Sequence, residues 1–248
     1  MKKNGFFLLC LTFEKSLFIM EKSKNRRMIV NIPECPKLRQ FPRSKKERVK
    51  QLHKELKALY PKAECALEFQ GDPFRLLVMA RLSAQCTDKR VNEVSRPLFQ
   101  RFPDAAAFAA ASQEEVEALV RPCGLYRSKA SQIREMSRVL IEEYNGLVPR
   151  DKKALMALPG VGEKIANLML GDVFDDPHIV ADTHMIRLSG RFGLTESKNP
   201  AIVTKDLEKI VPKAEQADFC HRMILLGRAY CKAQSPHCED CPLHGKNV

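Results

Sequence analysis

Apolar residues recur every three or four positions along most of this chain, and that spacing predicts helices. Val49, Leu52 and Leu56 would share one face of the first helix. Ser44 can begin this helix, and Pro61 lies where it should stop. No stretch alternates apolar and polar residues for long enough to predict a strand. The pattern therefore predicts an all-α fold.

Helix start and stop signals divide the rest of the chain. Ser112 and Glu115 have the spacing of a capping box, and Asn145-Gly146 should end a long helix. The other expected starts lie at Asp72, at Thr87 or Asp88, at Asp104, at Asp151 and at Asp182 or Thr183, with two further helices at about 200–211 and 216–230.

The segment 158–164 (LPGVGEK) interrupts this helical pattern. Pro159 ends one helix, and Gly160 and Gly162 allow backbone angles closed to other residues, so a tight turn is expected. The N–H groups at the start of the next helix would point outward and suit a phosphate. Lys164 would lie in the first turn of that helix, where the helix dipole should lower its pKa and make its amine a candidate nucleophile.

Four motifs follow one another in a fixed order, namely residues 82–88 (LSAQCTD), 124–130 (GLYRSKA), 158–164 (LPGVGEK) and 180–184 (VADTH). Together they resemble the helix-hairpin-helix DNA glycosylases, and most closely the endonuclease III family. The resemblance runs from about residue 46 to residue 241.

The resemblance implies two helical lobes with a DNA cleft between them. Residues 66–176 would form a six-helix barrel that carries the helix-hairpin-helix. Residues 46–65 and 177–248 would form the second lobe, which ends in a cysteine-rich loop. Residues 1–45 would be a basic, flexible N-terminal extension.

The resemblance also implies a repair glycosylase with AP lyase activity on oxidised or damaged pyrimidines in duplex DNA. Lys164 would attack C1′ of the nucleotide and form a Schiff base, and Asp182 would support this attack as a carboxylate. The attack needs a neutral amine, which burial and the helix N-terminus would favour. The ordinary alternatives are an exposed helix lysine and a helix N-cap aspartate. The adenine glycosylases of the superfamily lack a lysine at this place.

Other residues of the motifs would contact DNA. By resemblance, Gln85 and Leu125 enter the hole that a flipped base leaves, although spacing alone favours a helix end for Gln85 and a core position for Leu125. Gly160 and Gly162 would present backbone N–H groups to phosphate. His184 would orient the site or contact phosphate.

Two alternative functions remain at this point. The chain could be a related glycosylase for another lesion, such as oxidised guanine. It could also be a non-catalytic DNA-binding module that uses the hairpin only for phosphate contacts.

Three of the nine cysteines form a cluster of their own near the C-terminus. Cys231, Cys238 and Cys241 have the spacing of the family's iron–sulfur loop, but Asn247 stands where a fourth cysteine is expected. The resemblance implies a [4Fe–4S] cluster with three cysteine ligands. The alternatives are zinc held with His237 or His244, or a loop without metal.

Composition narrows the setting without identifying the function. The chain has 248 residues and a formal net charge of +12, which points to a polyanionic partner. Residues 1–50 contain 14 Lys or Arg and 4 Asp or Glu, net +10, so residues 51–248 carry only +2. The odd number of cysteines, six of which lie singly, favours reduced thiols in a cytoplasmic protein. The protein is expected to be a monomer, and to associate with the nucleoid if it is bacterial. The short apolar run near residues 6–13 predicts neither a signal peptide nor a membrane span.

Overall fold

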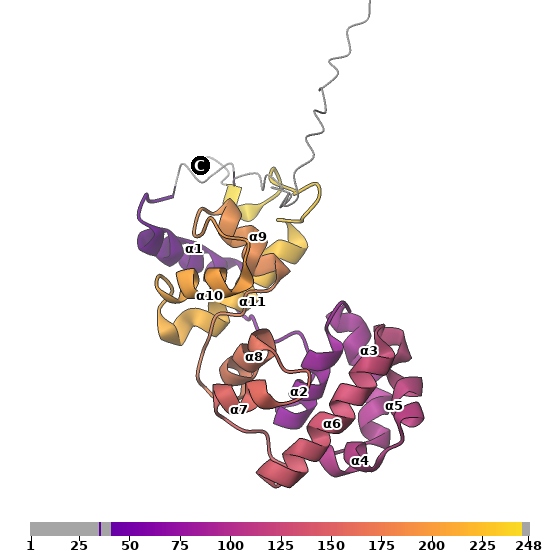
Figure 1. The fold of residues 1–248 in the computed structure, drawn as a ribbon. Helices are drawn as coiled ribbons and strands as arrows, with labels where there is room; N and C mark the ends of the chain where they lie inside the picture. Colours follow the sequence, from indigo (N-terminus) through magenta and orange to yellow (C-terminus); the bar gives the residue numbers. More distant parts are fainter. Residues whose placement is uncertain (1–34, 36–40, 245–248) are drawn as a thin grey trace, which may run out of the picture. The chain divides into compact units, whose positions relative to one another are not determined.

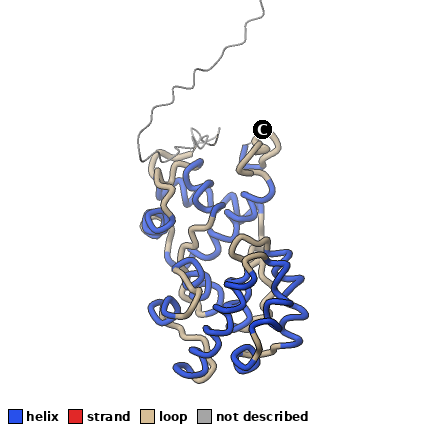
Figure 2. Tube along the Cα trace, turned by 45° about the vertical axis from the view of Figure 1, so that its right-hand side comes forward, coloured by secondary structure: helices blue, strands red, loops and turns tan. Residues whose placement is uncertain are grey.

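The computed structural model describes residues 35 and 41–244, and every regular element among them is helical (Figure 2). No strand occurs in these ranges, so the prediction of an all-α fold is confirmed. The described residues form two hydrophobic cores, one in each of two helical lobes.

The first lobe packs its helices around a cluster of aromatic rings. Phe108 lies at the centre of this cluster, and the rings of Phe74, Phe99 and Phe102 all contact it at centroid distances of 5.2–6.3 Å. Figure 1 shows these helices gathered together. They are α2 (Pro73–Leu82), α3 (Asp88–Arg101), α4 (Ala105–Ala110), α5 (Gln113–Val120), η2 (Arg121–Cys123), α6 (Tyr126–Tyr144), α7 (Lys152–Ala157) and α8 (Glu163–Val173).

The second lobe joins an early helix to the last third of the chain. Its core includes Leu52 and Leu56 from the early helix and Met185 and Leu226 from later ones, all fully buried. Its elements are α1 (Lys45–Leu59), α9 (Thr183–Arg191), α10 (Pro200–Glu208), η3 (Lys213–Glu215), α11 (Gln216–Ala229) and η4 (Pro242–His244).

The predicted helix starts are confirmed by their side-chain caps. Ser112 and Glu115 form the expected capping box. Ser44 is an N-cap by position, but its side chain makes no capping hydrogen bond. The remaining caps, each a side chain that accepts a backbone N–H of its own helix, are Asp72, Thr87, Asp104, Asp151 and Asp182.

The helix expected at about 200–211 ends early, at Glu208. The N–H groups of Ile210 and Val211 both turn back to the carbonyl oxygen of Leu207, which closes the helix with a tight turn before Pro212. A proline inside a helix removes a backbone hydrogen bond, so the helix ends about one turn before Pro212.

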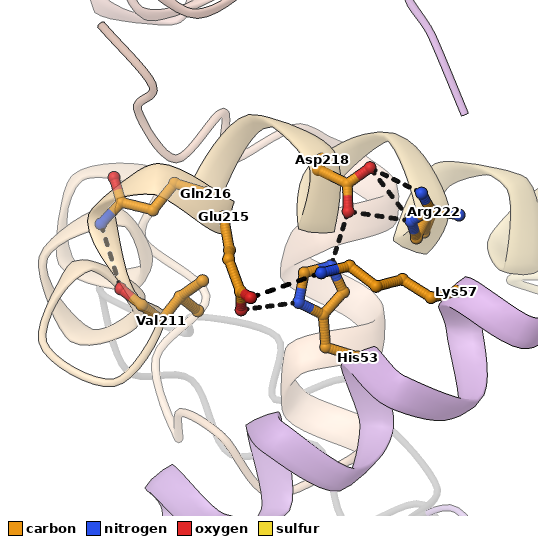
Figure 3. A network of polar contacts seen from close by, with 7 residues as sticks. All are labelled: His53, Lys57, Val211, Glu215, Gln216, Asp218 and Arg222. Atoms are coloured by element: carbon orange, nitrogen blue, oxygen red, sulfur yellow. Dashed lines mark hydrogen bonds and ion pairs between the residues drawn. The ribbon is translucent and has the colours of Figure 1, made fainter. Parts of the chain in front are cut away.

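A buried histidine links α1 to η3 and α11 (Figure 3). His53 is 2% exposed, and its two ring nitrogens contact Glu215 at 2.9 Å and Asp218 at 2.7 Å. Arg222 donates to the same Asp218 carboxylate at 2.8 Å. Because both ring nitrogens of His53 contact carboxylates of η3 and α11, this network holds α1 against these two elements at a defined register.

Among the described helices, none combines the length and the apolar character that crossing a membrane requires.

Candidate active site

A tight hairpin between α7 and α8 begins the site. Leu158 and Val161 are only 2% and 7% exposed, and their side chains hold the turn by packing into the core of the first lobe. Gly160 has φ of +77°, and a Cβ there would lie 2.8 Å from the side chains of Arg81 and Gln132. Gly160 is therefore required by its backbone angle, and a larger residue would also have to displace the ends of the Arg81 and Gln132 side chains.

Gly162 has a different role in the same turn. It is the N-cap of α8, with φ of −97°, and a Cβ there would meet nothing within 4 Å. The residue is exposed, so the N–H groups that open α8 face solvent. This is the geometry that the sequence predicted for a phosphate site.

Lys164 lies in the first turn of α8 and lines a pocket of about 120 Å³ together with Asp182. Among the described residues, its amine has no hydrogen-bond or ion-pair partner. Its side chain is exposed, so the expectation that burial would help to keep this amine neutral is wrong. The structure brings the two predicted catalytic residues to one pocket.

Asp182 is held rigidly at the start of α9. One carboxylate oxygen, Oδ1, accepts the N–H of Met185 at 2.7 Å, which leaves the other oxygen available. The capping role and a catalytic role are thus compatible, because the cap aims the carboxylate without using all of its acceptor capacity.

Two buried contacts fix the segment that leads into Asp182. Asn167, 1% exposed and one turn after Lys164 on α8, donates to the carbonyl oxygen of Ile179 at 2.8 Å. The N–H of Val180 donates to the Cys220 sulfur of α11 at 3.3 Å. Sequence reasoning missed Asn167, although a polar residue on the apolar face of a helix was a visible signal.

The pocket has further polar lining to which the sequence interpretation assigned no individual role in the site. Asp88, at the start of α3, forms an ion pair with Arg228 of α11, and both line the pocket. Ser83, the C-cap of α2, lines it as well. The pocket is therefore bounded by both lobes and carries charged groups of both signs.

His184 is next to the pocket in sequence but turns toward α11. Its Nδ1 contacts Arg187 at 3.1 Å, and a Cβ on Gly227 would lie 2.6 Å from that atom. Burial lowers the pKa of His184, and Arg187 and Arg228 lower it further, while Asp182 opposes them. The lowered pKa favours the neutral imidazole near pH 7.

Gln85 and Leu125 lie outside this pocket, each on a turn. Both adopt left-handed backbone angles, with φ of 54° and 48°, which side-chain-bearing residues rarely do. Leu125 is 55% exposed, so the core position that spacing favoured is wrong. Gln85 is exposed too and follows the end of α2 by three residues.

The cysteine-rich loop is organised by a buried arginine. Arg191, 3% exposed, donates to the Cys231 sulfur at 3.1 Å and to the Lys232 carbonyl oxygen at 2.7 Å. Cys238 and Cys241 follow in the same loop, and thiolates are the ligands that iron–sulfur clusters take. In residues 35 and 41–244, no three such side chains converge on a metal position, and Asn247 lies outside these ranges.

Comparison with known proteins agrees with these features. Residues 78–213 match the family described as HhH-GPD superfamily base excision DNA repair protein. Residues 231–245 match the iron–sulfur binding domain of endonuclease III, which supports the predicted [4Fe–4S] cluster.

Curated relatives and solved structures extend the match to most of the chain. Endonuclease III of Synechocystis sp. is 43% identical over 81% of this chain and 91% of its own length. Endonuclease III of Bacillus subtilis is 44% identical over 75% and 84%. A non-covalent endonuclease III–DNA complex aligns with a TM-score of 0.77 at 43% identity, covering 80% of this chain and 93% of that one. A trapped covalent endonuclease III–DNA intermediate aligns with a TM-score of 0.76 at 44% identity and the same coverage.

The hairpin, the lysine and the carboxylate of the shared pocket, and the cysteine-rich loop thus occur together in a chain that belongs to the endonuclease III family of the HhH-GPD superfamily, the DNA glycosylases and AP lyases of base excision repair.

Proposed function

We propose that this chain excises damaged pyrimidines from duplex DNA and nicks the strand through a Schiff base on Lys164. The observation that carries the proposal is the pocket shared by Lys164 of one lobe and Asp182 of the other. A relative 44% identical has been trapped as a covalent DNA intermediate, which an amine nucleophile explains.

The chemistry uses the two groups in turn. The amine of Lys164 attacks C1′, the C1′–N bond to the base breaks, and the base departs with that electron pair. Ring opening then gives a Schiff base, which acidifies a 2′ hydrogen. Loss of that proton expels the 3′ phosphate by cleavage of the C3′–O bond. Asp182 has a free carboxylate oxygen to accept the proton of the attacking amine and to offset positive charge on the sugar.

Bound DNA would shield the amine of Lys164 from water, which the exposed position of this residue does not do in the free protein. A nucleotide in the pocket displaces water from the amine and strengthens its interaction with Asp182. Asp88 and Arg228 would then face the polar edge of the extruded base, since they line the same pocket.

The duplex would be held by the groups around this pocket. The N–H groups beside Gly160 and Gly162 suit a backbone phosphate. Gln85 and Leu125 would fill the hole in the stack, the first by hydrogen bonds to the orphaned base and the second as a wedge. His184 would position the site from the side of α11.

We also propose the domain limits and the cluster ligands. The two cores support a barrel over residues 66–176 and a second lobe over 46–65 and 177–248. Residues 1–45 would be the extension, although its Phe41 is buried in the core of the second lobe and packs against Phe192. Cys231, Cys238 and Cys241 would hold the iron–sulfur cluster, which when bound cross-links their loop and keeps it in shape for DNA. We place the protein in the cytoplasm beside the nucleoid, as a monomer.

Borohydride trapping on a thymine-glycol duplex tests the proposal. Reduction during the reaction should join the protein covalently to DNA, and Lys164→Gln should abolish the adduct. Lys153→Gln is the matched control, because it removes another exposed lysine nearby, on α7.

Each competing result has a distinct meaning. An unchanged adduct yield in Lys164→Gln would assign the chemistry to another amine. Binding without any adduct in the unmodified protein would indicate a non-catalytic DNA-binding module. Faster excision from a duplex with oxidised guanine would reassign the lesion class.

A further inference from the structure

A completely buried lysine connects the two turns that carry Gln85 and Leu125. Lys129 of α6 is 0% exposed, and its ammonium donates 2.8 Å hydrogen bonds to the carbonyl oxygens of Leu82 and Cys123. Leu82 is the last residue of α2, and Cys123 is the last residue of η2. One side chain therefore joins two segments that are far apart in the sequence.

Each of these segments leads directly into a left-handed residue. Gln85 follows Leu82 by three positions, and Leu125 follows Cys123 by two. A side-chain-bearing residue in this conformation costs about 1–2 kcal/mol, so it persists only where its surroundings impose it. Leu125 is exposed, so core packing does not stabilise its left-handed conformation. Other contacts of the turn must stabilise it.

Two thiols lie beside these bonds, Cys86 after Gln85 and Cys123 before Leu125. Burial raises the pKa of the Cys123 thiol to about 12, and the nearby Cys86 thiol contributes in the same direction. The pKa of the Cys123 thiol thus responds to a residue of the Gln85 turn, which agrees with the closeness of the two turns. The two hydrogen bonds of Lys129 are thus the polar link between the turns.

We infer that Lys129 is a positioning residue that sets the spacing of the two turns, so that Gln85 and Leu125 enter the same gap in the DNA stack. The inference rests on the proposed function, because it assumes that these two side chains enter DNA. Both chain segments accept a hydrogen bond from the same ammonium. Neither turn can therefore move relative to the other without weakening one of these two bonds.

Burying a lysine at this position costs free energy unless its ammonium group makes hydrogen bonds. Burial lowers the pKa of Lys129, which reflects the penalty for an ammonium away from water. A leucine or methionine would fill the space without that penalty, but neither could bond two carbonyl oxygens at once.

The test compares two substrates for Lys129→Met in the full-length protein. Excision from a fully paired thymine-glycol duplex requires insertion, whereas cleavage of a preformed abasic site in single-stranded DNA does not. We expect single-turnover duplex excision to fall about 100-fold, as for other misplacements near 1 Å, while single-strand cleavage stays within about threefold. A 2-aminopurine placed opposite the lesion should also lose its fluorescence rise on binding.

Arg134→Met is the matched control. Arg134 also lies on α6 and donates to a carbonyl oxygen, that of Ala111, but Ala111 belongs to neither of the turns that carry Gln85 and Leu125. It should lower thermal stability and leave the ratio of the two activities unchanged. An equal loss on both substrates in Lys129→Met would reduce Lys129 to a fold-stabilising residue and overturn the inference.

A double-mutant comparison covers the case in which Lys129→Met folds poorly. In a Leu125→Ala background, Lys129→Gln should add little further loss of duplex excision, because both act on one step. Fully additive losses would contradict the inference. If the unmodified protein forms no trapped adduct on either substrate, the proposed function itself fails, which is a separate result.

Discussion

Asp182 caps α9 and has a proposed role in catalysis. Replacing one carboxylate oxygen by an amide nitrogen separates the two. Its oxygen caps α9, and its negative charge faces the pocket of Lys164. Asn caps helices about as well as Asp, so Asp182→Asn should keep the melting temperature nearly unchanged. The same change removes the charge, and we expect the single-turnover excision rate to fall about 100-fold or more.

Asp182→Ala should lose the cap as well, at a cost of about 1 kcal/mol in unfolding free energy. Thermal unfolding and single-turnover excision, measured on both variants, separate these effects. If Asp182→Asn kept the full rate, the charge would have no part in the reaction.

The residues themselves show where sequence reasoning stops. Asp88 was identified as a helix start, which it is, but its ion pair with Arg228 joins segments that only the fold brings together. The exposure of Lys164 likewise depends on which elements surround α8. Local patterns define backbone signals, whereas the lining of a pocket is a tertiary property.

At the scale of elements, the hairpin contains two glycines with different requirements. Gly160→Ala would place a Cβ at positive φ and 2.8 Å from Arg81 and Gln132, so we expect a loss of about 1–3 kcal/mol in unfolding free energy. DNA affinity should fall with it, because the turn must shift. Gly162→Ala, with open space around its Cβ, should change stability by less than about 1 kcal/mol.

Denaturant unfolding and equilibrium binding to a damaged duplex measure both effects. Equal destabilisation by the two alanines would show that the close approach beneath Gly160 does not constrain the hairpin.

The network that fastens α1 should make stability depend on pH. Burial acts to raise the pKa of Asp218, but hydrogen bonds from Arg222 and His53 outweigh it and the net shift is downward. A lowered pKa gives stability that is present above the unfolded value near 4 and is lost as the pH falls through the folded value. Asp218→Asn should therefore cost about 2 kcal/mol at pH 7, and the difference should shrink below about pH 4.

Asp176 supplies the control for this experiment. Its pKa is also lowered, by Lys213 and His178, but it lies on the surface, where such pairs contribute little. Asp176→Asn should leave urea unfolding almost unchanged from pH 3 to pH 7. A constant deficit of Asp218→Asn across this range would mean that its charge does not stabilise α1.

The elements were largely predictable because their start signals are local. A side chain that caps its own helix needs no distant partner, and Asp72, Thr87 and Asp104 all cap where the sequence predicted. His53 was not singled out, since its partners are more than 160 residues away. A lone histidine on an apolar helix face gives no sign of which carboxylates it will meet.

At the scale of the whole molecule, charge is unevenly distributed. Residues 1–50, which comprise the N-terminal extension and the start of α1, carry +10 of the total +12, so we expect the extension to contact phosphate. Replacing Lys22, Lys24, Arg26 and Arg27 with Gln should make the dependence of log binding constant on log salt shallower. Each lost phosphate contact should reduce the slope by about 0.9.

Titration of a damaged duplex at several salt concentrations gives the two slopes. Replacing Lys45, Lys46, Lys50 and Lys54 of α1 provides a comparison with equal loss of charge. Identical slopes for the unmodified protein and the first variant would place the extension away from DNA.

The hydrogen bond between Asn167 and Ile179 has one more consequence, for preorganisation. It couples the helix of Lys164 to the segment of Asp182, so the proposed nucleophile and its carboxylate should keep their relative position even when DNA bends or the surrounding turns adjust. The free energy of association is then available for distorting the duplex instead of assembling the reactive pair. Substitutions at Asp88, Arg228 or other lining residues during evolution would leave the proposed Lys164–Asp182 pair intact, so other damaged bases could be accepted without rebuilding it.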